Sequence, residues 1–201
     1  MGPVAAALAT QAALLRGPRP DLVISAGIGG AFVRPGAVAV GAAAVASEML
    51  YGDLGAWTGG APNGGEEDFL SLDALGLSVF PDGPKLHAAL PAPNPGRFPA
   101  WEESAVLASR LGVACGPFVT VSGATGSGEQ AQALLRRFPG ALIEGMEGAG
   151  VAHAAALYGV PCTEIRGASN LVGPRDRASW QIGAALGALR STLESALRFL
   201  D

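Results

Sequence analysis

The sequence predicts a single α/β domain, residues 1–201, in which helices cover both faces of a largely parallel β-sheet. The first observation behind this prediction is an alternation along the chain: short apolar runs rich in β-branched residues alternate with longer Ala- and Leu-rich runs of helical character. The second is composition, since 49% of the 201 residues are hydrophobic and only 15% are charged. A chain of this length and composition buries a real core and is not expected to be disordered.

Each expected element has a local reason. Helices are expected where Ala and Leu dominate or apolar residues recur at helical spacing, at residues 4–16, 101–111, 129–138, 147–158 and 178–200. Strands are expected at the short β-branched runs, at residues 22–25, 38–46, 116–122, 142–144 and 162–168. The glycines of 27–30 should end the first strand in a turn, and the Gly-rich 55–68 and Pro-rich 81–99 should be connections.

Composition also excludes several classes of protein. The formal charge of −4 argues against a nucleic-acid partner, which needs a concentrated basic surface. No apolar run reaches the roughly 18 residues of a membrane span, and the opening Met1-Gly2-Pro3 lacks the features of a secretion signal. Cys115 and Cys162 are expected to be buried thiols, and neither they nor the histidines have metal-ligand spacing. A cytoplasmic protein without metal or cofactor is expected.

The segment Gly27-Ile28-Gly29-Gly30 follows an expected buried strand at the edge where α/β sheets bind ligands. Its bare backbone would let amides approach an anion or a water closely. A plain tight turn explains the same residues equally well, and the spacing is not that of a dinucleotide-binding fingerprint.

Glu147 lies at an expected helix start, within the apolar and small residues of 146–150. The helix dipole favours its ionised form there, and two vicinal hydroxyls of a ribose would suit its two carboxylate oxygens. A carboxylate that caps the amides of its own helix is an equally good explanation.

Arg166 lies within an otherwise apolar strand, and Asn170 follows four residues later. An unpaired charge in such a strand is costly, so an anion should face Arg166. That anion is either a ligand or a structural partner, Glu164 or Glu144. Asn170 is either a ligand-binding carboxamide or a simple turn residue.

Taken together, these segments resemble the nucleosidase branch of the purine nucleoside phosphorylase superfamily. The resemblance covers nearly the whole chain and is carried by the order and spacing of segments 22–30, 146–148 and 165–170. Within this branch, segments 21–30 and 169–180 are similar to futalosine hydrolases, which release hypoxanthine from an inosine-like nucleoside on the menaquinone pathway. The resemblance implies a three-layer α/β/α nucleoside phosphorylase-like fold with a central mixed sheet, and a homo-oligomer without cofactors.

The resemblance also implies roles for individual residues. Glu147 would hold the ribose hydroxyls, Met146 would pack on the sugar, and Arg166 would lie near the water or anion position beneath it. Asn170 would donate to a 6-oxo group and accept from a protonated N7, whereas adenine-cleaving relatives carry Asp at this position. Further substrate contacts are implied for Gly27, Gly29, Ser122, Thr125 and Ser169.

Two departures from the family pattern stand out. The base-pocket segment 121–126 lacks the aromatic residue that often stacks on the purine in relatives. Relatives also begin with further strands and an acidic residue that activates water, so we expect this chain to lack those strands and to be oligomeric and weakly active or inactive. If the water is instead activated from within the chain, Asp53 and Asp176 are the first candidates.

The expected function is therefore hydrolysis of a hypoxanthine nucleoside, futalosine by resemblance. Two alternatives remain at the level of sequence. One is a phosphate-dependent phosphorylase for 6-oxopurine nucleosides, and the other is a non-catalytic relative that binds a nucleoside or pairs with a partner subunit.

Overall fold

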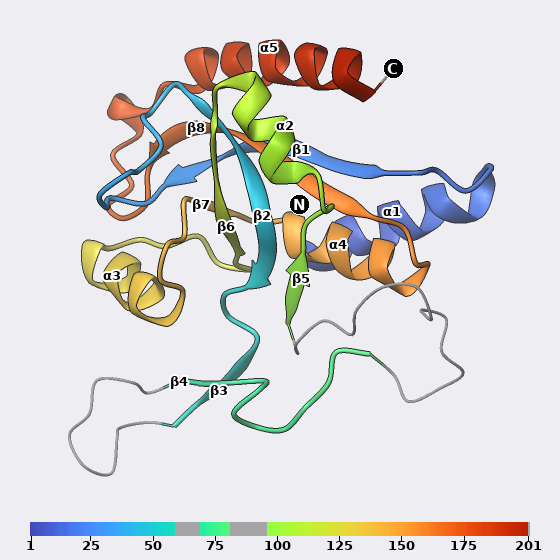
Figure 1. Cartoon of the computed structure of the whole chain (residues 1–201). Coiled ribbons are helices and arrows are strands. Elements are labelled where there is room, and N and C mark those ends of the chain that lie inside the picture. Colours follow the sequence, from blue (N-terminus) through green and yellow to red (C-terminus); the bar gives the residue numbers. More distant parts are fainter. Residues whose placement is uncertain (59–68, 81–95, 201) are drawn as a thin grey trace.

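The computed structural model describes residues 1–58, 69–80 and 96–200 (Figure 1). Its elements in chain order are α1 (Pro3–Arg16), β1 (Val23–Ala31), β2 (Ala43–Tyr51), β3 (Gly55–Trp57), β4 (Phe69–Ser71), β5 (Arg97–Pro99), α2 (Ser104–Leu111), β6 (Ala114–Thr120), α3 (Gly128–Arg137), β7 (Ile143–Gly145), α4 (Gly148–Leu157), β8 (Cys162–Leu171), the 3₁₀ turn η1 (Arg177–Ser179) and α5 (Ile182–Leu200). Most of the two expected connections, 55–68 and 81–99, lies outside the described residues.

The main sheet has the strand order β5-β2-β6-β7-β1-β8, and β8 also pairs with β2. Five strands, β2, β6, β7, β1 and β8, therefore close into a ring, and β5 pairs with β2 outside it. The pairs β1–β8, β2–β6 and β6–β7 are parallel, while β1–β7, β2–β5 and β2–β8 are antiparallel. The sheet is thus mixed, as the family resemblance implies, and not largely parallel as the alternation of elements suggested.

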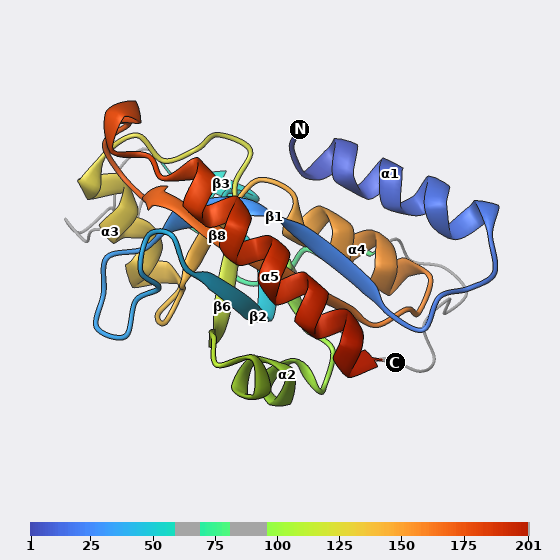
Figure 2. The same cartoon turned by 90° about the horizontal axis from the view of Figure 1, so that it is seen from above.

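Helices form the outer layers. In Figures 1 and 2, α5 runs across one face of the sheet beside α2, while α4 lies on the opposite face with α1 outside it. The described elements thus form the expected three-layer α/β/α arrangement, with α3 at the side next to β6 and β7.

Each helix layer has its own apolar cluster because side chains alternate between the two faces of a strand. On β2, Ala44 and Ala46 point toward α4 and pack with Met49 and Phe118. Val45, between them, points the other way toward α2 and α5. A further cluster lies beneath α3, formed by Phe32, Leu50, Val119, Val121, Ala131, Leu134, Ala141 and Val172.

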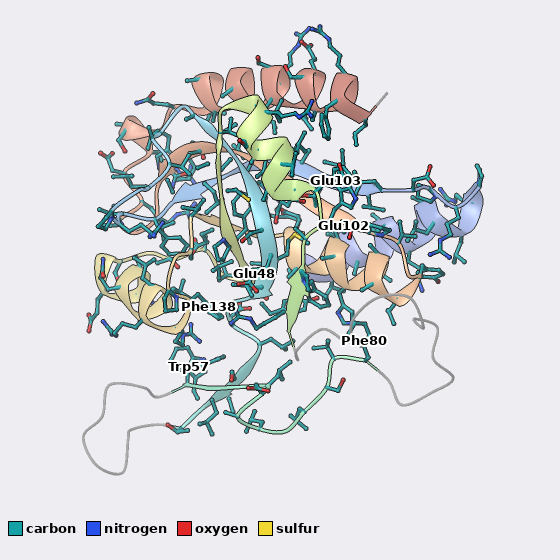
Figure 3. All side chains as sticks on the ribbon, viewed as in Figure 1. Glu48, Trp57, Phe80, Glu102, Glu103 and Phe138 are labelled. Atoms are coloured by element: carbon teal, nitrogen blue, oxygen red, sulfur yellow. The ribbon has the colours of Figure 1, made fainter. Side chains whose placement is uncertain are left out.

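The small β3–β4 ribbon packs against α3 through aromatic rings. Trp57 meets Phe69 edge to face with ring centroids 5.1 Å apart, and the Arg137 guanidinium lies 4.1 Å from the centre of the Phe69 ring. Figure 3 shows Phe138 on the same side as Trp57. These contacts attach the ribbon to the domain.

Several local expectations were wrong. The strand expected at 38–46 begins at Ala43 and continues to Tyr51, and the expected connections 55–68 and 81–99 contain the short strands β3 and β5 in their described parts. Residues 27–30 are not a turn: β1 continues through them to Ala31, and they pair in parallel with β8. Their low strand propensity is overridden by neighbours that leave no room for side chains at Gly27 and Gly29. Cys115 is exposed on β6, whereas Cys162 is buried as expected.

Within the described ranges, no helix is long and apolar enough to span a membrane. No cluster of three or more His, Cys, Asp or Glu side chains suited to a metal ion was found among the same residues.

Candidate active site

A cavity of about 500 Å³ opens where β1, β7 and β8 end. It also receives residues from the turn after β6, from the β7–α4 junction and from the segment after β8. The lining residues are Met1, Ile28, Gly29, Gly30, Ala124, Thr125, Glu144, Gly145, Met146, Glu147, Arg166, Ser169, Asn170, Val172, Gly173, Arg175 and Trp180.

Arg166 is the central cation of the cavity, and its side chain is only 5% exposed. Each of its three nitrogens donates a hydrogen bond: Nε to Glu164 Oε1 at 2.6 Å, Nη1 to the Ile28 carbonyl at 2.9 Å and Nη2 to Glu147 Oε2 at 3.1 Å. Burial disfavours the charged form, but the carboxylates of Glu164 and Glu147 outweigh burial and raise the pKa of Arg166. The guanidinium is therefore held charged and in one orientation.

Glu164 and Glu147 have different surroundings. Glu164 is 2% exposed and lies behind Arg166, away from the cavity lining. Burial raises the pKa of Glu164, and the charge of Arg166 opposes that rise. The side chain of Glu147 is 31% exposed and lines the cavity. Glu147 thus supplies the carboxylate of the pair that a ligand can reach.

Glu147 does not cap its own helix. It occupies the N-cap position of α4, but its side chain makes no capping hydrogen bond. Its oxygens instead accept from Arg166 Nη2 and, at 3.4 Å, from the backbone amide of Gly2. The sequence left open whether Glu147 binds a ligand or caps its own helix, and the structure is inconsistent with the helix cap.

The glycines of β1 make room for the charged groups. A Cβ at Gly27 would lie 2.5 Å from Arg166 Nη1, and one at Gly29 would lie 2.6 Å from the Glu144 carbonyl oxygen. Contacts this short force a displacement, so side chains at these positions would move the groups that define the cavity. Gly29 lines the cavity, whereas Gly27 lies beneath Arg166 and does not.

Glu144 is a further buried carboxylate that lines the cavity. Its residue is 8% exposed, and it accepts hydrogen bonds from the Thr125 amide at 3.0 Å and from the Thr125 hydroxyl. Burial raises the pKa of Glu144, and the bonds from Thr125 and the charge of Arg175 only partly offset that rise.

Asn170 lies near the end of β8, next to Ser169. Its Oδ1 is 2.7 Å from the Ser169 hydroxyl, and its Nδ2 donates to the Leu171 carbonyl at 2.9 Å. The carboxamide keeps one N–H and one lone pair for a ligand. The Ser169 hydroxyl is also 3.1 Å from the Gly29 carbonyl, which ties this pair of residues to β1.

An aromatic side chain lines the cavity from a segment that the sequence interpretation did not assign to the site. Trp180 follows η1, and the Arg175 guanidinium lies 5.3 Å from the centre of its ring. The cavity lining therefore includes an aromatic residue, although segment 121–126 contains none.

The structure brings together most of the predicted site residues. Those at the cavity are Gly29, Thr125, Met146, Glu147, Arg166, Ser169 and Asn170. Ser122 is displaced from it, because its backbone amide donates to Asp53 at 2.5 Å outside the cavity lining. Asp53 is therefore occupied elsewhere, and Asp176 caps η1 by accepting from the Ala178 amide.

Sequence reasoning missed Glu144 as a cavity residue and considered it only as a partner for Arg166. The signal was present, since Glu144 ends an apolar strand just as Arg166 interrupts one. Arg175 was not assigned to the site, and Ile28 was not recognised because its contribution is a backbone carbonyl.

Comparison with known proteins places the chain among nucleoside-processing enzymes. Residues 1–200 match the family model described as the phosphorylase superfamily. A futalosine hydrolase of Streptomyces coelicolor is 43% identical over 196 residues, which cover 94% of this chain and 72% of the relative. A futalosine hydrolase of Thermus thermophilus is 34% identical over 201 residues, covering 98% of this chain and 78% of the relative.

A solved structure shares the fold. The native futalosine hydrolase of Helicobacter pylori superposes with a TM-score of 0.73 at 18% identity, covering 98% of this chain and 76% of that one. The matched length and the identity to the curated relatives are decisive, and the chain belongs to the phosphorylase superfamily.

Proposed function

We propose that this chain is a nucleosidase that hydrolyses the N-glycosidic bond of futalosine to hypoxanthine and dehypoxanthine futalosine, a step of menaquinone biosynthesis. The observation that most strongly supports this proposal is the identity of 43% to a futalosine hydrolase over 94% of the chain. The arrangement of Glu147, Arg166 and Asn170 around one cavity supports it.

The cavity residues suit glycosidic cleavage. The reaction passes through a cationic, oxocarbenium-like sugar, so a carboxylate beside the ribose stabilises the transition state. Glu147 has that place in the proposal: it accepts from the ribose hydroxyls while Met146 packs on the sugar. Asn170 donates to O6 of the purine and accepts from N7–H as the base leaves.

Water, and not phosphate, is the proposed nucleophile. The guanidinium of Arg166 already faces two carboxylates, at 2.6 and 3.1 Å, so its charge is compensated before any ligand enters. A phosphate dianion placed beside it would also meet Glu147, and like charges at close range are unfavourable. The second N–H of each terminal nitrogen remains for a neutral water.

A direct assay of hypoxanthine release tests this proposal. Purified protein is incubated with futalosine with and without phosphate, and hypoxanthine is measured by liquid chromatography. We expect hypoxanthine at the same rate in both cases and a free reducing sugar on the other product. Strict dependence on phosphate would favour a phosphorylase, and comparable adenine release from methylthioadenosine would contradict the substrate assignment.

Two further features belong to the same proposal. A homo-oligomer is supported by exposed apolar side chains at Val4, Leu8 and Leu15, which form a stripe along α1, and is tested by light scattering after gel filtration. A cytoplasmic location is supported by the two unpaired cysteines and is tested by fractionation of the producing cells.

A further inference from the structure

Two polar side chains flank one glycine in the cavity. Gly30 of β1 is paired with Glu144 of β7 on one side and with Asn170 of β8 on the other. All three residues line the cavity. Residues at one register position across neighbouring strands project to the same face, so Glu144 and Asn170 face a common space above Gly30.

The gap between them is kept open by the glycine. A Cβ at Gly30 would lie 2.9 Å from Val172 Cγ2 and 3.3 Å from Asn170 Nδ2, so any larger residue would intrude on the carboxamide. Strands two positions apart in a sheet are separated by about 9–10 Å. A purine ring system with a hydrogen bond of about 2.9 Å at each flank fits that span.

Glu144 has acceptor capacity that the protein does not use. Its two oxygens each accept one hydrogen bond from Thr125, which fixes the carboxylate plane. None of the ion pairs among the described residues includes Glu144. A carboxylate that is buried without an ion pair is costly unless a further donor reaches it. The remaining lone pairs therefore suit a ligand N–H.

We propose that Glu144 accepts a hydrogen bond from N1–H of the purine. Glu144 and Asn170 then recognise the base together, Glu144 at N1 and Asn170 at O6 and N7. A 6-oxopurine offers an N–H at N1 and an acceptor at O6, which match the carboxylate and the carboxamide. A 6-aminopurine has a bare lone pair at N1, which faces the carboxylate unfavourably. This role rests on the proposed function and adds a second specificity-determining residue to it.

The test measures binding of free bases by calorimetry, so that it does not depend on turnover. The probes are hypoxanthine, 1-methylhypoxanthine and adenine. Wild-type protein should bind hypoxanthine at least tenfold more tightly than either other base, because each lacks the N1–H donor to a charged acceptor. Equal binding of hypoxanthine and 1-methylhypoxanthine would overturn the proposal without any variant.

The isosteric variant Glu144→Gln then separates a specific contact from a structural role. It should reduce the preference for hypoxanthine over adenine by about tenfold, because a neutral amide accepts more weakly and also donates to N1 of adenine. General damage to the cavity would weaken both bases equally and leave their ratio unchanged, which contradicts the proposal. The control is Glu194→Gln, which changes an exposed carboxylate on α5 that pairs with Arg190 and does not line the cavity.

The proposed reaction and the proposed contact between Glu144 and the base can be refuted separately. If wild-type protein releases no hypoxanthine from futalosine but discriminates against the N1-methylated base through Glu144, the reaction is wrong and the base contact stands. If futalosine is hydrolysed and Glu144→Gln leaves the ratio of base affinities unchanged, the base contact is wrong and the reaction stands.

Discussion

Replacement of Gly148 by Ala tests whether Glu164 and Arg166 are held as tightly as the structure indicates. Gly148 is the first residue of α4 and is buried against the Glu164 side chain. A Cβ at this position would have the Glu164 carboxyl carbon and both its oxygens within 2.5 Å. The methyl group therefore forces either the helix or the Glu164 carboxylate to move.

The expected magnitude follows from three opposing contributions. Alanine stabilises a helix relative to glycine by about 1 kcal/mol. Overpacking of a rigid core costs about 1–3 kcal/mol. Separation of a buried ion pair costs about 3–5 kcal/mol. Because Arg166 would keep Glu147 as a partner, we expect the lower end of that range, about 3 kcal/mol, and a net loss of about 3–5 kcal/mol in the free energy of unfolding.

The assay is urea unfolding with a matched glycine as control. Gly187 lies in α5, is exposed, and has open space around a Cβ. Gly187→Ala should raise the free energy of unfolding by about 0.5–1 kcal/mol through helix propensity alone. If Gly148→Ala is as stable as the wild type, the Glu164 carboxylate moves freely and the account of a fixed Arg166 is refuted.

Three further predictions concern the site and its surroundings. Glu147→Gln should lower the rate of hypoxanthine release by about 10²–10³, because it removes the charge beside the cationic sugar; a rate within threefold of the wild type would contradict this. Asn170→Asp should lower activity on the 6-oxopurine nucleoside more than it lowers the melting temperature, since a carboxylate would face O6; equal losses for 6-oxo and 6-amino substrates would show no contact with the base. The Nε2–H of His153 donates to the Val79 carbonyl at 3.1 Å, its Nδ1 lies 3.2 Å from Tyr51 Oη, and burial lowers the pKa of His153 below the ordinary 6.5. The unfolded chain therefore binds the proton more readily, stability should fall as pH drops below about 6.5, and His153→Gln should flatten that slope in chemical unfolding.

Helices and most strands could be predicted from local pattern. The Ala-rich segment before Gly17 and the apolar spacing of α5 lead to helices within a few residues of the observed bounds. Segment 27–30 could not be placed in the same way, because what keeps it in a strand is the packing of Arg166 and Glu144 against bare glycines. Those neighbours lie more than 100 residues away in the chain.

The site residues also differ in whether local sequence could identify them. Glu147, Arg166 and Asn170 could be found because each is a polar residue out of place in its local setting. The proposed role of Glu144 depends on register, since β7 pairs antiparallel with β1 and Glu144 thereby faces the end of β8 across Gly30. No local pattern encodes that pairing. Ser122 illustrates the reverse, since it lies in the expected segment but its amide is used by Asp53.

Strand β1 links the two ends of the cavity. Gly27 lies beneath the guanidinium that contacts Glu147, at the proposed sugar end, and Gly30 lies between Glu144 and Asn170, at the proposed base end. Three residues along a strand span about 10 Å, which is comparable to the length of a nucleoside from its ribose hydroxyls to the far edge of its base. The glycines are needed at both ends for the same reason, because each takes the place of a side chain that would displace a charged or polar group. A single strand therefore sets the distance between the proposed sugar-binding groups and the proposed base-binding groups, and the pairing of β1 with β7 and β8 fixes both sets of groups against it.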